Sequence, residues 1–455
     1  MSDQALPQQW LDTPLENVIL KITGGGTPSK SKPEYYRGDI PWMSVKDMDK
    51  HVLKDTVDHI SLEAVENSST NIIPAGTPII ATRMSLGKIV VAHFDSAINQ
   101  DLKALFLPSE IHRDYLVYWY RSFAHKIEQL GTGTTVKGIR LDALKTLECA
   151  LPPLAEQKVI ADKLDTLLAQ ADRIKARLER IPEILKRFRQ SVLAAAVSGR
   201  LTEDWRNEYE VSITTWEQAT VGDVSKVATG KTPNRKEIKY WQAGEVPWLT
   251  SASTGAIYTN SAEQYVTQFA VTDCSLKIFP PGTLLLAMYG EGKTRGQVTE
   301  LNISAACNQA CAAIAAKENK VLRGYLKLRL LENYEETRKA AAGGAQPNLN
   351  LNKVREIGIA VPSQEEQAEI VRRVDQLFAY ADTVERQVNS ALERVNQLSQ
   401  SILAKAFRGE LTAQWRADNP ELVSGENSAE ALLERIKEER AAQAPKKRTR
   451  KKAKA

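Results

Sequence analysis

The chain repeats a long segment of its own sequence 210 positions further on. Residues 156–206 and 366–416 align without a gap, and 19 of the 51 aligned positions are identical. The two copies end on nearly the same string, RLTEDWR in the first and ELTAQWR in the second. A repeat spaced this widely indicates duplicated domains rather than a solenoid, in which short repeats stack on their neighbours. We therefore expect two related halves.

Apolar residues in both copies recur in alternating steps of four and three. This is the heptad pattern of a coiled coil, with charged residues between the apolar positions. The simplest way to bury both seams is to pair the two helices with each other; the alternative is that each seam binds a different partner subunit. The seams comprise Ile160, Leu164, Leu167, Ala171, Ile174, Leu178, Ile181, Leu185, Phe188, Val192 and Ala195 in the first copy, and Ile370, Val374, Leu377, Ala381, Val384, Val388, Ala391, Val395, Leu398 and Ile402 in the second.

Both expected helices carry signals at their ends. Ser363 and Glu366, three residues apart, form the pattern of a capping box at the start of the second helix. Gly199 and Gly409 follow the last seam residues, as helix-terminating glycines do. Each helix would run for about 40 residues, or roughly 60 Å. Pro182 lies within the first seam and lacks a backbone N–H, so we expect a bend there rather than an end, because the seam stays in phase across it.

The segments before the two helices correspond more loosely. GGTPSK, YYRGDIPWMS and INQDLKAL in the first half match GKTPNR, YWQAGEVPWLT and CNQACAAI in the second. Short β-branched runs alternate with helical stretches such as RDYLVYWYRSFAHKIEQL, which predicts an α/β domain of roughly 150 residues in each half.

The predicted fold class is therefore α/β, with two similar α/β domains separated by two long helices. These helices would form an antiparallel intramolecular coiled coil, and the whole chain would have pseudo-two-fold symmetry. The expected boundaries are 1–152 for the first α/β domain, 153–198 for the first helix, 199–361 for the second domain, 362–408 for the second helix, 409–440 for a C-terminal segment that packs back towards the N-terminus, and 441–455 for a basic, disordered tail.

Charge is unevenly distributed along the chain. The net charge is +5, but the tail AAQAPKKRTRKKAKA holds seven Lys or Arg residues and no acid. The remainder has 54 basic and 56 acidic side chains, because seven of the 61 basic residues lie in the tail. The tail could touch phosphate non-specifically or act only as a solubilising end. The rest of the chain, which we call the body, has no excess of positive charge. It would therefore bind nucleic acid through local basic patches or with help from partners.

Several classes of protein are disfavoured. Cys307 and Cys311 have no second pair and no nearby His, so zinc binding is not expected, and the four cysteines read as buried thiols in a reducing cytosol. The start MSDQALPQQW has no signal-peptide pattern, and no apolar run approaches the roughly 18 residues of a membrane helix. These features predict a cytoplasmic protein.

No catalytic motif is convincing. GEGKT at 290–294 has Ala287 where a phosphate-binding loop needs its first glycine. GTGTTVKG breaks the dinucleotide-binding pattern at Val136, and no Asp/Asn-Pro-Pro-aromatic string of an amino-methyltransferase is present. The five scattered histidines offer no pair of metal ligands. The chain is therefore predicted to be a non-enzyme without a metal site.

Recognition remains as the function. Two similar but non-identical modules at a fixed separation could recognise two different short base sequences on one DNA duplex. Arg and Lys can bond guanine edges, Asn and Gln can bond adenine edges, and all of them can bond phosphate. Any single residue of this kind could be an ordinary solvated side chain, so the hypothesis depends on the set. The candidate DNA-binding residues are Ser29, Lys30, Lys32, Tyr36, Arg37, Lys46, Arg83, Lys88, Lys137 and Arg140 in the first module, and Asn234, Arg235, Lys236, Lys239, Lys293, Arg295, Gln297 and Gln346 in the second.

At this point the residues resemble a known family. LPPLAEQKVIADKLDTLLAQADRIKARLERIPEILKRFRQSVLAAAVSGRLTEDWR is similar to the central conserved region of the DNA-specificity subunits of type I restriction-modification systems. EEQAEIVRRVDQLFAYADTVERQVNSALERVNQLSQSILAKAFRGELTAQWR resembles the distal conserved region, and the match continues through PELVSGENSAEALLERIKEER. The likeness is to the enteric, K-12-like branch of the family. GTPS, YYRGDIPW and GTGTTVKGI resemble recurrent elements of its target-recognition domains.

The resemblance implies a role. The two α/β domains would be target-recognition domains that each read one half of an asymmetric bipartite site, and the helical rod would set the spacing and dock the partners. Those partners would be double-stranded DNA, two methylation subunits and two restriction (motor-nuclease) subunits, with no membrane. The complex would direct adenine N6 methylation and cleavage of unmodified DNA. S-adenosylmethionine would belong to the methylation partner, ATP and Mg to the restriction partner, and no cofactor to this chain.

Two other functions stay open from the residues alone. One is a coiled-coil adaptor without sequence-specific DNA binding, and the other is a self-contained DNA-modifying enzyme of unusual sequence.

Overall fold

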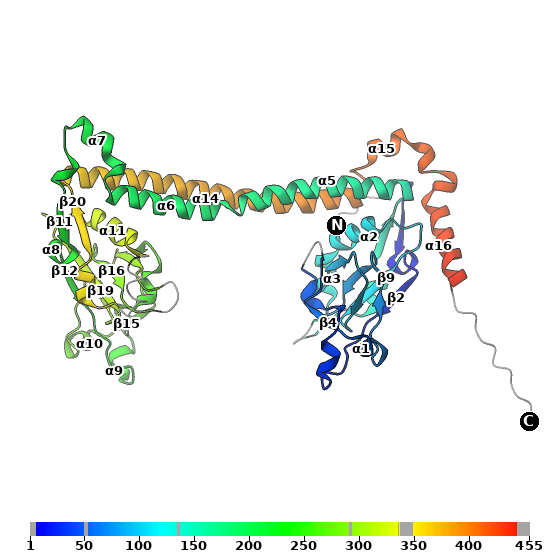
Figure 1. Cartoon of the computed structure of the whole chain (residues 1–455), viewed down its shortest axis with the longest axis horizontal. Helices are drawn as coiled ribbons and strands as arrows, with labels where there is room; N and C mark the ends of the chain where they lie inside the picture. Colours follow the sequence, from blue (N-terminus) through cyan, green and yellow to red (C-terminus); the bar gives the residue numbers. More distant parts are fainter. Residues whose placement is uncertain are drawn as a thin grey trace, which may run out of the picture. The chain divides into compact units, whose positions relative to one another are not determined.

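The computed structural model forms two compact units, and each unit combines an α/β domain with a pair of helical segments (Figure 1). The first unit consists of Met1–Leu178 and Ala391–Ala455, and the second unit consists of Glu179–Ser390. The structure describes residues 6–49, 53–133, 137–290, 294–334, 336 and 349–443.

The α/β domain of the first unit contains two small sheets and a separate two-stranded ladder. Its strands are β1 (Leu11–Pro14), β2 (Lys21–Gly24), β3 (Ile40–Met43), β4 (Asp58–Ile60), β5 (Ile72–Ile73), β6 (Pro78–Ala81), β7 (Ile89–Val91), β8 (Ser96–Ile98), β9 (Leu102–Phe106) and β10 (Glu148–Leu151). One sheet has the order β2-β9-β6-β7 and the other has the order β4-β3-β8-β5, while β1 pairs antiparallel with β10. Strands such as β6 are buried on both faces, which fits their continuous apolar sequence.

The α/β domain of the second unit repeats this plan. Its strands are β11 (Glu217–Thr220), β12 (Ser225–Thr229), β13 (Val246–Leu249), β14 (Tyr258–Thr259), β15 (Gln264–Val266), β16 (Leu284–Ala287), β17 (Val298–Leu301), β18 (Ala306–Cys307), β19 (Cys311–Ala316) and β20 (Gly358–Val361). The order β12-β19-β16-β17 corresponds to β2-β9-β6-β7, with β14 added at the edge, and β15-β13-β18 corresponds to β4-β3-β8. The ladder β11–β20 corresponds to β1–β10. The prediction of two similar α/β domains is confirmed.

Short helices lie between the strands in the sequence of both domains. The first unit has α1 (Leu62–Glu66), α2 (Arg113–Ser122), α3 (Ala124–Leu130) and α4 (Leu141–Lys145), and the second has α8 (Val221–Val224), α9 (Ile238–Trp241), α10 (Gln268–Asp273), α11 (Arg323–Glu332) and α13 (Leu351–Arg355). Two buried tyrosines occupy equivalent places: the hydroxyl of Tyr115 in α2 donates to the carbonyl of Ala150 at 2.6 Å, and that of Tyr325 in α11 donates to the carbonyl of Ala360 at 2.7 Å. Each bond fastens a helix to the ladder strand that leads into a long helix.

Long helices pair within each unit. The first unit holds α5 (Leu154–Leu178) and the end of α14 (Gln364–Phe407). The seam residues Ile160 and Leu164 of α5 lie in one core with Leu403 of α14, and the seam residue Ile402 packs against this core. The second unit holds α6 (Ile181–Val197) and the start of α14, with Val192 and Ile370 in one core. In both units the beginning of one helix bonds to the segment just after the end of the other, so the pairing is antiparallel. The predicted intramolecular coiled coil and the fold class are confirmed, although the seam residues Ile174 and Leu398 stay about half exposed.

The first helical copy differs from the second at Pro182. Helical structure ends at Leu178 and resumes at Ile181, with a turn at the two residues between, whereas α14 runs unbroken for 44 residues. In a continuous helix the N–H of residue 182 would bond to the carbonyl of Leu178, and proline has no N–H to give. The expected bend is therefore a two-residue break between two helices.

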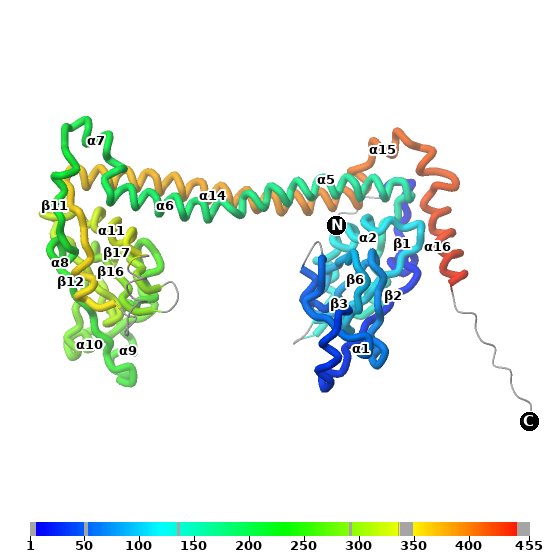
Figure 2. The backbone as a smooth tube through the Cα atoms, viewed as in Figure 1, coloured from blue at the N-terminus to red at the C-terminus, as the bar shows by residue number. Residues whose placement is uncertain are grey.

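The C-terminal segment adds α15 (Ala413–Asp418) and α16 (Ala429–Gln443) to the first unit. Leu432 and Ile436 of α16 join the core of the first α/β domain. A guanidinium nitrogen of Arg440 donates to the carbonyl of Ile19 at 2.7 Å, and Arg435 pairs with Glu110 at 2.9 Å. Figure 2 shows α16, in red, beside β1, in blue. Within the described residues, no helix is both long enough and apolar enough to cross a bilayer.

Candidate nucleic-acid interface and its supporting clusters

A buried glutamate joins the α/β domain of the second unit to its helices. Glu366, at the start of α14, is fully buried. It accepts a hydrogen bond from the indole N–H of Trp216 at 2.9 Å, one from the hydroxyl of Thr202 at 2.8 Å and one from the guanidinium of Arg206 at 2.6 Å. Trp216 comes from the start of the domain, and Thr202 and Arg206 come from the segment that follows α6. One carboxylate thus holds three separate parts of the unit together.

The first unit has the same cluster around Glu156, which is also fully buried. The indole N–H of Trp10 donates to it at 2.9 Å, and the hydroxyl of Thr412 donates at 2.6 Å. Arg416 pairs with it at 3.2 Å and lies over the ring of Trp10, 5.6 Å from its centroid. Because a buried charge is costly unless it is paired and hydrogen-bonded, these partners are required together.

The repeated LTxxWR string supplies two of the partners in each cluster. Its Thr and Arg bond the carboxylate, and the Arg also bonds the carbonyl of the preceding glycine, Gly199 or Gly409, at 2.7 and 2.6 Å. Both glycines have positive φ, 77° and 75°, as expected for residues that end helices. The repeat was visible in the sequence, but the role of the glutamates was missed. The available signal was that the glutamate, the threonine and the arginine are identical in both copies.

One prediction at the start of α14 is partly wrong. Ser363 does cap the helix, because the backbone N–H of Glu366 donates to its hydroxyl at 3.3 Å. The side chain of Glu366 does not turn back to complete a capping box, since both of its oxygens bond the cluster described above. The tertiary partners, which are stronger donors, replace the local one.

The next residue in each copy orients the helix on its domain. Gln157 accepts from the backbone N–H of His112 at 2.8 Å, and Gln367 accepts from that of Leu322 at 2.7 Å. Their amide nitrogens donate to the carbonyls of Pro152 and Pro362. The N-termini of α2 and α11 are thereby fastened to the long helices in the same way in both units.

The candidate DNA-binding residues before β3 lie on the surface of the first unit. Lys30 and Arg37 are exposed, and the hydroxyl of Ser29 hydrogen-bonds that of Ser31 at 2.8 Å. The ammonium of Lys32 donates to the hydroxyl of Tyr35, an interaction that raises the pKa of Lys32. The hydroxyl of Tyr36 donates to a backbone carbonyl at 2.7 Å. The exposed cations of this loop are therefore placed to meet an anionic ligand.

A second group in the first unit comes from two segments far apart in sequence. A bridge between Arg83 and Gly138 brings the loop after β6 beside the loop that holds Lys137, and both cations are exposed. Arg83 pairs with Asp101 at 3.4 Å, Lys88 pairs with Asp49, and Lys46 pairs with Asp58 at 2.8 Å, a bond that raises the pKa of Lys46. Arg140 is exposed nearby in the chain. The sequence alone did not reveal these acidic partners. If the cations bind DNA, phosphate groups would have to replace the aspartates.

The second unit presents a different surface at the corresponding loop. The guanidinium of Arg235 lies 4.2 Å and 4.6 Å from the ring centroids of Trp241 and Trp248, and it donates to Gln264 at 2.6 Å. Lys239 lies over the rings of Tyr240 and Phe269. Two further candidates, Asn234 and Lys236, are exposed. Stacking on aromatic faces orders the cations.

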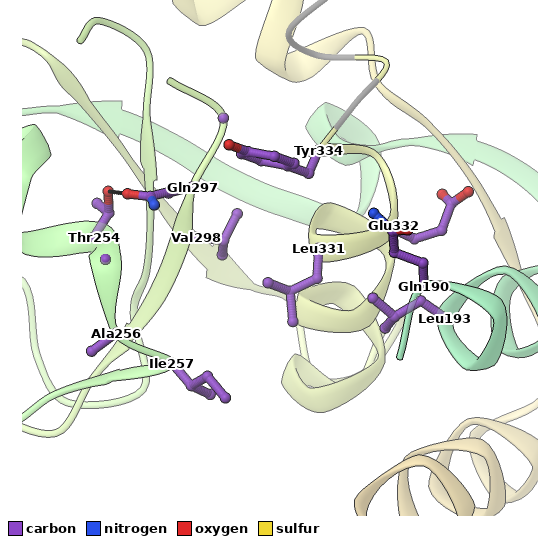
Figure 3. A pocket seen from close by; sticks show the side chains of 12 residues that line it. Gln190, Leu193, Thr254, Ala256, Ile257, Gln297, Val298, Leu331, Glu332 and Tyr334 are labelled. Carbon is purple, nitrogen blue, oxygen red and sulfur yellow. Dashed lines mark hydrogen bonds between the residues drawn. The ribbon is translucent and has the colours of Figure 1, made fainter. Parts of the chain in front are cut away.

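One of the remaining candidates of the second unit, Gln297, lies at a pocket of about 470 Å³. Gln297 lines the pocket, where it faces Thr254, while Gln190 and Leu193 of α6 line the opposite side (Figure 3). Arg295 is half-buried, and its Nε has no hydrogen-bond partner among the described residues. Lys293 and Gln346 lie outside the described residues. Across the described part of the chain, no group of three His, Cys, Asp or Glu side chains is placed to hold a metal ion.

Comparisons with known proteins agree with this architecture. The family model for the type I restriction modification DNA specificity domain matches residues 7–183 and 213–394. The chain is 36% identical to the specificity subunit of the type I restriction enzyme StySPI from Salmonella potsdam and 35% identical to that of EcoKI from Escherichia coli K12, with full coverage of both chains in each case.

Two solved structures share the fold at 18% sequence identity. One, described as showing complex assembly and conformational transition of the type I R-M system, has a TM-score of 0.69 and covers 89% of this chain and 99% of its own. The other is the HsdS subunit from Thermoanaerobacter tengcongensis, with a TM-score of 0.57 and coverage of 90% and 99%.

Proposed function

The chain belongs to the family of type I restriction modification DNA specificity proteins, and from that premise we propose that each α/β domain reads one half of an asymmetric, two-part DNA site. A specificity subunit of a type I restriction enzyme is not its catalytic subunit. The chain is therefore not an enzyme by itself, and the methylation and cleavage activities lie in partner subunits.

The observation that carries this proposal is a duplicated domain with unlike surface residues. The strand order of the first domain recurs in the second, so both domains can present a loop in the same place. The loop before β3 offers Lys30 where the loop before β13 offers Arg235, and of these two cations only Arg235 lies over a pair of tryptophan rings. Equivalent loops with different donors suit two different base sequences.

The long helices support the second part of the proposal, that they set the spacing between the half-sites and dock the partner subunits. Each buried glutamate cluster fixes an α/β domain onto its own helix pair. Helix α14 continues from one unit into the other without a break in its hydrogen bonding. A stiff connection of this kind would hold two readers at a separation set by helix length, while loops would not.

The proposed partners are double-stranded DNA, two methylation subunits and two restriction subunits. S-adenosylmethionine would be bound by the methylation subunits, and ATP and Mg by the restriction subunits, so that adenine N6 methylation protects the site that the complete complex otherwise selects for cleavage. The nearly balanced charge of the body fits a chain that shares phosphate contacts with its partners.

Mapping N6-methyladenine tests the proposal directly. A genome expressing this chain with its methylation subunits should carry the mark at one two-part motif with unlike halves. Exchanging Leu11–Leu151 for the equivalent segment of another family member should change only one half, since Trp10 and Glu156 stay in place. Exchanging Glu217–Val361 should change only the other half. If either exchange alters both halves, the proposal of two independent readers is wrong; if no motif is methylated, the chain does not direct methylation.

A further inference from the structure

The loop after β6 carries an exposed methionine in a strained backbone conformation. Met84 has φ of 62°, and 56% of its surface is exposed. The backbone N–H of Ser85 donates to the carbonyl of Arg83 at 2.7 Å, which closes a three-residue turn with Met84 at its centre. A turn of this type with positive φ is the rare and strained form of the γ-turn. In the described part of the chain, the other non-glycine residues with positive φ are small or polar: Glu210, Ala243 and Ser275.

The backbone around Met84 is held from both sides. Its N–H donates to the carbonyl of Lys137 at 2.9 Å, and the N–H of Ile139 donates to the carbonyl of Thr82 at 2.9 Å. On the other side, Gly87 approaches Ala124 so closely that a Cβ would lie 2.8 Å from its Cα. The strain therefore persists because the neighbouring segments impose it, and strained residues of this kind concentrate where ligands are clamped.

The surroundings of Met84 indicate which ligand fits. Arg83 precedes it in the chain, Lys137 accepts its backbone hydrogen bond, and Lys88 follows in the same loop. A single exposed apolar residue on a protein surface needs no explanation. An apolar side chain on a strained turn, next in the chain to such cations, is different. Once phosphate replaces Asp101 and Asp49 as the partners of Arg83 and Lys88, the three cations bind a polyanion, while the methionine side chain favours a non-polar contact.

Resting on the proposed function, we propose that Met84 is a DNA wedge: its side chain inserts between two adjacent base pairs of the half-site read by the first unit, while the flanking cations contact phosphates. Apolar side chains, including methionine, enter base steps from the minor groove, unstack them partially and kink the duplex. The unbranched thioether adapts to the opened step. Specificity then follows partly from how easily the step deforms, and pyrimidine–purine steps deform most readily.

The test uses the complex of this chain with its methylation subunits and a short duplex that carries the mapped methylation motif. Each purine in the first unit's half-site is replaced in turn by 2-aminopurine, whose fluorescence rises when stacking is lost. The wild-type complex should prefer this duplex over a scrambled one and should raise the fluorescence at one step. Met84→Ala should abolish the rise and weaken binding about tenfold or more, as truncation of an anchoring side chain does. Met84→Leu should retain most of both.

A matched control is Leu62→Ala in α1. Leu62 is 59% exposed in the same unit, but its neighbours in the helix include Glu63 and Glu66 rather than cations. This variant should bind and unstack DNA as the wild type does. Met84→Gly separates folding from binding, because glycine removes the strain along with the side chain. It should melt no lower than Met84→Ala and bind DNA no better.

Each result has a clear consequence. A wild-type complex that unstacks no purine, or a Met84→Ala complex that keeps both affinity and fluorescence, overturns the wedge. A Met84→Gly variant that melts below Met84→Ala shows that the backbone is not strained there. A wild-type complex without preference for the motif duplex contradicts the proposed function instead.

Discussion

At each junction between an α/β domain and its helices, a single carboxylate organises the contacts. Glu156 and Glu366 each collect an indole N–H, a hydroxyl and a guanidinium from parts of the chain that are distant in sequence. A buried charge with a full set of donors is tolerated, but its removal leaves the guanidinium buried and unpaired. These residues are therefore expected to matter for stability rather than for contact with DNA.

Replacing Glu366 tests this expectation. Glu366→Gln leaves Arg206 buried without its counter-charge, and we expect a loss of about 3–5 kcal/mol in stability of the second unit. The neighbouring Glu365 is exposed, so Glu365→Gln is the matched control and should cost less than about 1 kcal/mol. Calorimetric melting measures both. The double variant Glu366→Gln/Arg206→Met should recover part of the loss, because it removes the unpaired charge; no recovery would show that the charge pair is not the cause.

Among the elements, the helices were predictable from the sequence and the sheets were not. The heptad spacing identified both helices, and because both copies lie in one chain their mutual pairing was the simplest way to bury the two seams. The spacing by itself left open that each seam binds a different partner subunit. The strands are two to six residues long, and their order depends on pairings between distant segments, such as Leu11 with Leu151, that no local pattern specifies. The same limit applied to the surface cations: Asp49, Asp58 and Asp101, which pair with three candidate DNA-binding residues, are recognisable as partners only in the folded domain.

The break at Pro182 gives a prediction at this scale. The equivalent position in α14 is Leu392, within an unbroken helix. Pro182→Leu restores the missing donor and should join α5 to α6, with slower amide hydrogen exchange at residues 179–184. Leu392→Pro should have the opposite effect in α14, at a cost of about 3 kcal/mol or more. Unchanged exchange in Pro182→Leu would mean that the surrounding residues, and not the proline, end the helix.

On the scale of the whole molecule, each of the two units joins its α/β domain to its helices through the same set of contacts. The ladder, the tyrosine bond, the glutamine bond and the glutamate cluster all have equivalents in both units. A domain taken from one unit should therefore fit the helices of the other.

Duplicating one reader tests this exchangeability. We expect a chain with Glu217–Val361 in place of Leu11–Leu151, expressed with its methylation subunits, to methylate a motif with two identical halves in inverted orientation. The inversion follows from the predicted pseudo-two-fold symmetry, and sequencing of N6-methyladenine reads it out. Identical halves in direct orientation would contradict that symmetry, and retention of the original motif would contradict the assignment of reading to the exchanged segments.

The first unit is built from both ends of the chain, and this has a consequence for biosynthesis. A ribosome makes Trp10 and Glu156 early, but Thr412 and Arg416, which complete their cluster, come last. The second cluster closes once Glu366 has emerged, before those residues exist. At about 5–20 residues per second, the 260 positions from Glu156 to Arg416 leave the first cluster incomplete for roughly 13–52 s, and it closes 50 positions after Glu366 is made. During translation, the first domain to be made is thus the last to be fixed to its helices. Until then α5 lacks its partner, the end of α14, and its apolar seam is exposed to chaperones or to a neighbouring nascent chain.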